Sequence, residues 1–322
     1  MQPGARRGLI GAAGTQPRPV MKTSTPLNRR EFVKRSAVAA LAFAAAPAAL
    51  TAPADTKKLP WKFCAFEKPM LFLNYDETAE FFSELGFDGI EAAVRPGGHV
   101  LPERVEEDLP KFVAALKKRG LEITVLTSNI GSADQPHAET VLRTAARLGI
   151  KRYRMDWYRY DLKAPILPQL EALRPKLKAL AALNRSLGLT GLYQNHAGAA
   201  MVGAGLWDIM SLLRDHDAKE VALAFDIRHA TVEAGQSWPT VFQLVKAHIG
   251  VAYFKDFVWE EDKLRNVPLG EGRVDKKYGA MLKESGFSGP ISLHVEYGAG
   301  QDRQVFAAAF RKDFATLRNW LT

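Results

Sequence analysis

The sequence predicts an α/β fold in which a single closed (β/α)8 TIM barrel follows an N-terminal leader. Two observations favour this fold. The 268 residues from 55 to 322 are close to the ~250 that such a barrel typically has. Over this length, short β-type segments alternate with amphipathic helical segments, which is typical of one parallel sheet covered by helices.

Residues 1–54 have the features of a leader. The segment Asn28–Lys34 contains a pair of arginines, and an alanine-rich stretch at 37–50 and small residues at 52–54 follow it. This pattern indicates a twin-arginine signal peptide and an exported, periplasmic protein. No membrane span is expected, because about 14 apolar residues are fewer than the ~20 that cross a bilayer. Since Met21 is a suitable start for such a signal, residues 1–20 would be explained by a misassigned start.

Eight strand–helix units account for residues 55–322. We expect strands near 62–67, 89–95, 122–128, 152–156, 191–196, 221–226, 251–257 and 291–296. Helical periodicity is present at 77–85, 105–118, 138–148, 167–187, 207–213 and 241–247. Glycines near several helix ends suit the positive φ that helix termination favours. These units would form one parallel, right-handed barrel.

Strand parity predicts which side chains face the barrel interior. In the last strand, Ser292, His294 and Glu296 lie on the face opposite the apolar residues. Outward positions must pack on helices, so the polar columns point inward, and their last members reach the carboxyl ends of the strands. We therefore expect a cluster of Asp226, Glu296, Arg95 and Asp156 at one rim, where enzymes of this fold keep their chemistry.

Four segments carry a resemblance to a known family. They are Gly191–His196 (GLYQNH), Ala224–His229 (AFDIRH), Tyr253–Asp256 (YFKD) and Ser292–Glu296 (SLHVE). In this order they resemble the strand-end motifs of the xylose-isomerase-like sugar phosphate isomerase/epimerase superfamily. The resemblance implies a sugar isomerase/epimerase that abstracts a proton next to a carbonyl, assisted by a divalent metal (Mn, Mg, Co or Zn).

The resemblance implies metal ligands at Gln194, Asp226, Tyr253 and Glu296, with Glu296 also acting in acid–base catalysis. Two of these positions depart from the family pattern, which has glutamate in the first motif and histidine in the third. A glutamine offers one neutral oxygen and cannot act as a base at neutral pH, and tyrosine is an uncommon ligand for these ions. The family mechanism with two glutamates therefore cannot be transferred intact.

Other residues are candidates for the missing roles. His196 shares the parity of Gln194 and is a candidate base or ligand. Lys255 is a candidate fixed cation that would stabilise an oxyanion without a metal. His229, from the second motif, is a further catalytic candidate.

Substrate-binding candidates lie at the strand ends and in the loops after them. They are Glu91, Arg95, His99, Asp156 and Trp238. An internal ion pair with Arg95, Arg154 or Arg228 is the structural alternative for Asp226 and Glu296. Asp256 is expected to cap a loop, and His294 to be a hydrogen-bonded interior residue. The glycines of 268–273 lie where TIM barrels often bind phosphate, although one Gly-x-Gly is weak evidence.

Charge and cysteine content narrow the classes of partner. The net charge of +9 lies mostly in residues 1–54, and the rest has 36 basic and 34 acidic residues. We therefore expect a small-molecule sugar as the partner and no nucleic acid. Cys64 is the only cysteine, which excludes an intrachain disulfide and a thiolate zinc site.

Export makes an unphosphorylated sugar or keto-sugar the expected substrate. One alternative is a catalytically reduced carbohydrate-binding barrel that has lost two metal ligands. Another is the endonuclease branch of the same fold, which the seven histidines and the near-neutral charge of 55–322 disfavour.

Overall fold

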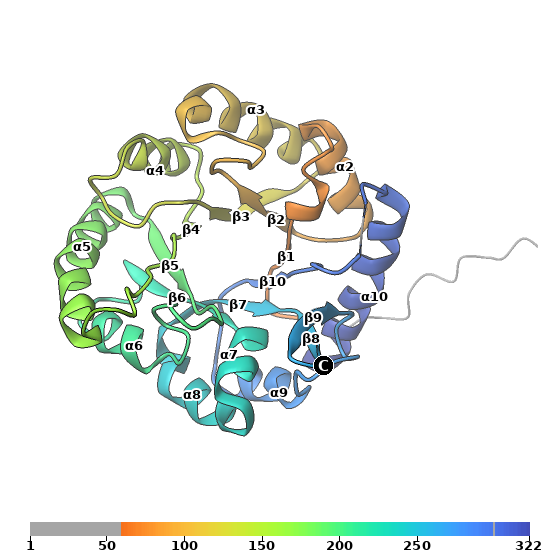
Figure 1. The fold of residues 1–322 in the computed structure, drawn as a ribbon. Coiled ribbons are helices and arrows are strands. Elements are labelled where there is room, and N and C mark those ends of the chain that lie inside the picture. The colour runs from red at the N-terminus through yellow and green to blue at the C-terminus, as the bar shows by residue number, and fades with distance from the viewer. Residues whose placement is uncertain (1–58, 299) are drawn as a thin grey trace, which may run out of the picture. The chain divides into compact units, whose positions relative to one another are not determined.

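A computed structural model describes residues 59–298 and 300–322. Its eight parallel strands close into a barrel in the order β1-β10-β7-β6-β5-β4-β3-β2 (Figure 1), which confirms the predicted (β/α)8 TIM barrel. The strands are β1 (Phe63–Phe66), β2 (Gly89–Ala93), β3 (Glu122–Thr127), β4 (Arg152–Arg154), β5 (Thr190–Gln194), β6 (Val221–Asp226), β7 (Ile249–Phe254) and β10 (Ile291–Leu293). The predicted leader at 1–54 lies outside the described residues.

Helices surround the barrel as an outer ring in Figure 1. They are α2 (Tyr75–Glu84), α3 (Val105–Lys118), α4 (Ala138–Arg147), α5 (Ile166–Leu187), α6 (Trp207–Leu213), α7 (Ile227–Ala234), α8 (Trp238–Val245), α9 (Lys277–Glu284) and α10 (Arg303–Leu321). The helices predicted at 105–118 and 207–213 match the observed bounds of α3 and α6. Among the helices predicted from the sequence, none corresponds to α7, α9 or α10.

Alternation along the strands separates two cores. The outer core, between strands and helices, includes Phe82, Phe112 and Phe310. The interior of the barrel holds a small cluster made of Val125, Leu192, Ala222, Ala224, Val251 and Tyr253. Because side chains alternate between the two faces, the polar residues that share a parity with this interior cluster also point into the barrel.

The end of β7 differs from the prediction. The expected strand at 251–257 stops at Phe254, and the chain enters an antiparallel hairpin of β8 (Asp256–Glu260) and β9 (Lys263–Val267). The buried Asp256 carboxylate accepts the backbone N–H groups of Phe257, Gly270, Gly272 and Val274 at 2.8–3.0 Å. This internal anion fixes the glycine loop, so these amides are engaged within the protein and not turned toward a phosphate.

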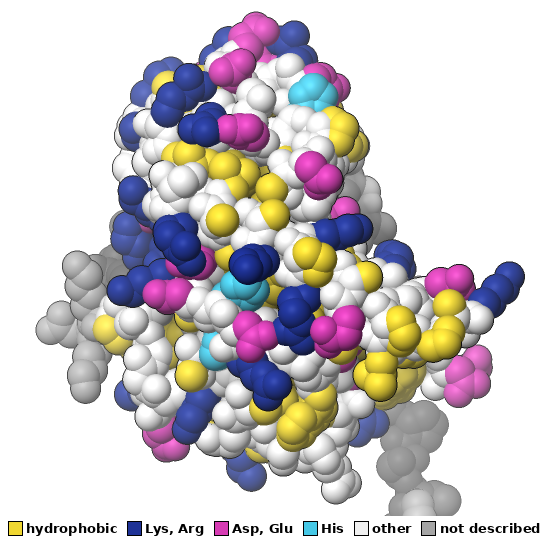
Figure 2. Space-filling view, turned by 90° about the vertical axis from the view of Figure 1, so that its left-hand side faces the viewer, with side chains coloured by type: hydrophobic (Ala, Val, Ile, Leu, Met, Phe, Trp, Pro, Cys, Tyr) yellow, Lys and Arg dark blue, Asp and Glu magenta, His cyan; other side chains and the backbone are white. Residues whose placement is uncertain are grey.

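The helices of the described part of the chain include none with the length and apolar character needed to cross a bilayer. On the face shown in Figure 2, basic and acidic side chains are interspersed.

Candidate active site

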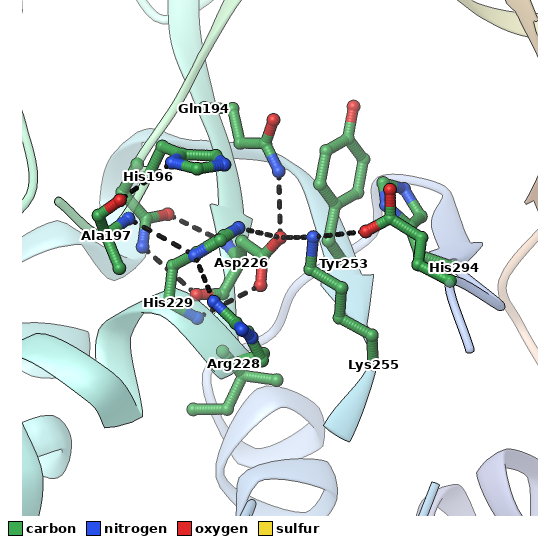
Figure 3. A network of polar contacts seen from close by, with 12 residues as sticks. Gln194, His196, Ala197, Asp226, Arg228, His229, Tyr253, Lys255 and His294 are labelled. Carbon is green, nitrogen blue, oxygen red and sulfur yellow. Dashed lines mark hydrogen bonds and ion pairs between the residues drawn. The ribbon is translucent and has the colours of Figure 1, made fainter. Parts of the chain in front are cut away.

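A buried lysine joins two carboxylates at the carboxyl ends of the barrel strands, a region that we call the mouth. Lys255 Nζ lies 3.2 Å from Asp226 Oδ2 and 2.8 Å from Glu296 Oε2 (Figure 3). Burial disfavours the charged form of Lys255, but the two carboxylates outweigh burial and raise its pKa. Burial likewise opposes ionisation of Glu296, but Lys255, His294 and Lys68 together hold the pKa of Glu296 far below its usual range. The cluster is therefore one ammonium held by two carboxylates.

Asp226 is held in position by hydrogen bonds to Asn195, after β5, and to the first turn of α7. Asn195, just after β5, donates its side-chain amide to the Asp226 carbonyl and accepts the Asp226 N–H, at 3.0 and 2.8 Å. The Asp226 carboxylate also caps α7 by accepting the His229 N–H at 3.2 Å. An aspartate in this role satisfies a free N–H of the first helical turn, and the same cap sets the positions of Arg228 and His229.

The four metal positions that the resemblance implies do not present a common set of lone pairs. The Gln194 oxygen accepts from Arg154 Nη1 at 2.8 Å, and its amide nitrogen donates to Asp226 Oδ2 at 2.8 Å. The Tyr253 hydroxyl donates to Glu91 at 3.0 Å. Burial raises the pKa of this phenol far above its usual range. Within 59–298 and 300–322, no group of three His, Cys, Asp or Glu could hold a metal. The donor set does not fit a shared divalent ion.

Two histidines lie side by side next to Asp226, with ring centroids 4.0 Å apart (Figure 3). His196 Nδ1 lies 2.9 Å from the Ala197 carbonyl and must carry the proton there, which leaves Nε2 with a free lone pair. His229 Nδ1 instead accepts from the Ala197 N–H at 3.2 Å and from Arg228 Nη1 at 3.0 Å. Its proton is therefore on Nε2, 3.6 Å from Asp226 Oδ2.

Both rings are neutral at pH 7. Burial, followed by the Lys255 charge, lowers the pKa of His196. The same two causes, with His196 and Arg228 added, lower the pKa of His229 well below its usual value. The pair thus offers one lone pair, on His196, and one N–H group, on His229, and the Lys255 charge acts on both rings.

Glu91 is at the centre of a second polar cluster, inside the barrel. Its carboxylate accepts from four side chains at 2.6–3.0 Å: those of Thr127, Tyr253, Ser292 and His294. Burial opposes its ionisation, but His294, Arg154 and these hydrogen bonds lower the pKa of Glu91 to about 2. Glu91 is 0% exposed, so the structure places this predicted substrate-binding residue beneath the mouth, where its oxygens bond to the protein.

The guanidinium groups of Arg95 and Arg154 both lie over one aromatic ring. Their guanidinium carbons lie 5.9 and 5.3 Å from the centroid of Phe66, at the end of β1. Arg95 follows β2, and Arg154 ends β4 two residues before Asp156. Burial, then the charge of Arg154, lowers the pKa of Arg95, which Glu91, Asp156 and Glu296 partly offset. The charges of Asp156 and Glu296 thus both act on Arg95.

His99 and Trp238 lie apart from the lysine cluster. Both ring nitrogens of His99 are engaged, Nδ1 by the buried Glu67 carboxylate and Nε2 by the Leu73 carbonyl at 2.8 Å. Trp238 is 6% exposed and packs edge-on against Tyr278 in the outer core. The structure therefore does not bring Trp238 to the mouth, and it gives His99 a role in tying loops together.

Three side chains near the site were not among the predicted site residues, and Arg154 was named only as an ion-pair partner for Asp226 or Glu296. Arg154 has the same strand parity as Asp156, so parity already placed it in the interior. Lys68, 3.1 Å from Glu296 Oε1, and Glu67 follow directly after β1. No motif marks these two residues, although their position at a strand end was a usable signal.

Comparisons with known proteins agree with the geometry. No curated protein matches this chain. Among solved structures, it is similar to a probable 3-DHS dehydratase, AsbF, from Bacillus anthracis (16% identity, TM-score 0.62, covering 80% of this chain and 98% of the other). A second is the 3-keto-D-glucoside 4-epimerase YcjR from E. coli (16%, 0.61, 80% and 99%). A third is the IOLI protein with a bound zinc atom (17%, 0.64, 81% and 98%).

The family model described as "Xylose isomerase-like TIM barrel" matches residues 79–319. This match runs from α2 to α10 and includes all four motifs noted in the sequence. Solved structures similar to this chain include a D-psicose 3-epimerase, an L-ribulose 3-epimerase and the probable dehydratase, and two others hold magnesium or zinc. The chain belongs to the xylose isomerase-like TIM barrel family.

Proposed function

We propose that this protein is an enzyme that moves a proton on the carbon next to the carbonyl of an unphosphorylated sugar or keto-sugar, in an isomerisation, epimerisation or elimination. The Lys255 ammonium, 3.2 and 2.8 Å from Asp226 and Glu296, is the observation that carries this proposal. Abstraction of such a proton creates an enediolate oxyanion, and a preorganised cation stabilises the developing charge. Asp226 and Glu296 keep the lysine charged and hold it in place.

His196 is the base in this proposal. A carboxylate with a strongly lowered pKa, such as Glu296, is a weak base, whereas a neutral imidazole with a free lone pair suits proton transfer near neutral pH. The proton would pass from the substrate carbon to His196 Nε2 and return to carbon or leave with a departing hydroxyl. His229 would donate a hydrogen bond through Nε2–H. The similar epimerases and dehydratase support this reaction class.

A divalent metal (Mn, Mg, Co or Zn) is the other possible source of positive charge. The bonds made by Gln194 and Tyr253 favour the ammonium instead. We also propose that the protein is exported, on the basis of the twin-arginine pattern, which favours an unphosphorylated substrate.

Exchange in D₂O tests the reaction. We expect NMR to show incorporation of solvent deuterium next to the carbonyl of at least one ketose or 3-keto-sugar. The exchange should persist after dialysis against EDTA, with metal analysis to check that the dialysed protein holds no divalent metal. Lys255→Gln should slow it by about a thousandfold, which is the upper range for removing an oxyanion-stabilising donor. The exposed Lys246→Gln should leave it unchanged.

Folding of each variant would be checked by circular dichroism, with Glu296→Gln as a milder second change that should also slow the exchange. Exchange that disappears with EDTA and returns with Mn, Mg, Co or Zn would assign the charge to a metal. Binding of sugars without any exchange would favour the carbohydrate-binding alternative.

A further inference from the structure

The side of the mouth formed by β1, β2 and β4 holds two guanidinium groups that the protein's own acceptors engage only in part. Arg95 and Arg154 both stack on Phe66, at 5.9 and 5.3 Å from the ring centroid. Arg154 is 4% exposed and Arg95 is partly buried. Two cations on one ring repel each other, and desolvation makes an uncompensated charge more costly.

Three carboxylates, Glu91, Asp156 and Glu296, act on Arg95 electrostatically, but among the described residues none pairs closely with it, and Glu91 is engaged by other side chains. Glu91 Oε1 lies 3.8 Å from Arg154 Nη1, while the Glu91 oxygens accept four shorter hydrogen bonds from other side chains. Arg154 Nε is buried without a hydrogen-bond partner. The ion pairs found among residues 59–298 and 300–322 include none with Arg95. Among the described residues, the side chain of Arg95 and the Nε–H group of Arg154 are therefore left without a hydrogen-bond acceptor.

We propose that the substrate carries a carboxylate, which binds at Arg95 and Arg154. This inference rests on the proposed function, because it concerns the substrate of the same site. A carboxylate brings one negative charge, and its two planar oxygens suit the donors of a guanidinium fork.

The barrel order also constrains where the carboxylate lies on the substrate. Lys255 follows β7, while Arg95 and Arg154 belong to β2 and β4; in the closed barrel, two strands separate β7 from β2 on one side and from β4 on the other. The carboxylate and the reacting carbonyl would thus be held at opposite sides of the mouth. The substrate class is an acidic sugar whose carbonyl is not adjacent to its carboxylate.

Binding of matched acid and neutral sugars tests this inference without turnover. The probes are D-galacturonate, D-glucuronate and D-gluconate, each compared by calorimetry and thermal melting with D-galactose, D-glucose and D-sorbitol. At least one acid should bind about tenfold more tightly than its neutral partner, as expected for one added charge-assisted pair. Added NaCl should reduce the preference.

Substitutions of single arginines test whether the preference for the acid arises at Arg95. Arg95→Gln should remove the roughly tenfold preference for the acid, and Arg95→Lys should keep part of it because the charge remains without the planar fork. Arg143→Gln, on the exposed face of α4, is the matched control and should keep the preference.

The proposal is overturned if no acid is preferred over its neutral partner, or if Arg95→Gln retains the preference. Tighter binding of D-glucose 6-phosphate or D-galactose 6-phosphate than of the acids would also overturn the carboxylate assignment. If acids bind through Arg95 but no deuterium exchange occurs, the proposed reaction fails while this inference stands. If neutral keto-sugars exchange deuterium but no acid is preferred, this inference fails while the proposed reaction stands.

Discussion

The barrel interior contains two carboxylate clusters that differ in how completely they are satisfied. Glu91 is fully buried and accepts four hydrogen bonds from side chains of β3, β7 and the β10 region. Glu296, at the mouth, is 18% exposed and is held by two ammonium groups, Lys255 and the exposed Lys68. A saturated network stabilises the fold, whereas ammonium groups at an accessible rim can exchange a carboxylate for a substrate oxygen. Burial and hydrogen bonding therefore distinguish Glu91, which stabilises the fold, from Glu296, which lies at the proposed reaction site.

Removing each charge in turn should sharpen this contrast. Glu91→Gln should lower the free energy of unfolding by about 3 kcal/mol, because it leaves buried Arg154 without its carboxylate. Glu296→Gln should cost no more than about 1 kcal/mol, since the site is partly exposed and Asp226 still pairs with Lys255. Urea unfolding of both variants measures the difference, and equal losses would contradict the distinction.

The contribution of Glu91 to stability should also depend on pH in a defined direction. The pKa of Glu91 falls to about 2 in the folded protein, below its unfolded value of about 4.3. Its stabilisation is therefore present above about pH 4.3 and is lost as the pH falls toward 2. The Glu91→Gln variant should lack this part of the acid-induced loss of stability.

Strand parity and alternation were sufficient to predict the barrel and the interior position of the polar columns. The β8–β9 hairpin was not predictable, because Val258 and Trp259 extend the apolar appearance of β7, and Asp256 binds amides 14 to 18 residues away in the loop after β9. Such a contact between distant residues leaves no local pattern.

At the mouth, the expected cluster was Asp226, Glu296, Arg95 and Asp156, whereas the structure joins Asp226 and Glu296 through Lys255. The bonding state of each side chain did not follow from the sequence. Whether Gln194 turns its oxygen to a ligand or to Arg154 depends on a charge from the neighbouring strand. The engagement of both His99 nitrogens likewise depends on Glu67, which no motif marks.

The two histidines of the mouth should give a smaller, pH-dependent effect on catalysis. His196→Asn should lower kcat/KM about a hundredfold, the scale of general base catalysis. In the wild type the acid limb of the pH profile should lie below pH 6.5, because burial and Lys255 lower the pKa of His196 and the neutral base persists to lower pH. His248→Asn, just before β7 at the amino end of the barrel, is the control. A limb above pH 7 would contradict this assignment.

The smallest effect should come from the Glu67–His99 pair, which ties the loops after β1 and β2 together. Burial disfavours the His99 cation, but the bonds to Glu67 outweigh burial and raise the pKa of His99. Its stabilisation is therefore full below the unfolded pKa of about 6.5 and is lost as the pH rises through the folded value. His99→Gln should cost about 1 kcal/mol at pH 5.5, as for one charge-assisted bond, and less at about pH 9. Urea unfolding at both pH values measures this. A cost that grows with pH would show that the ring is held as neutral imidazole, which can donate to only one of Glu67 and the Leu73 carbonyl.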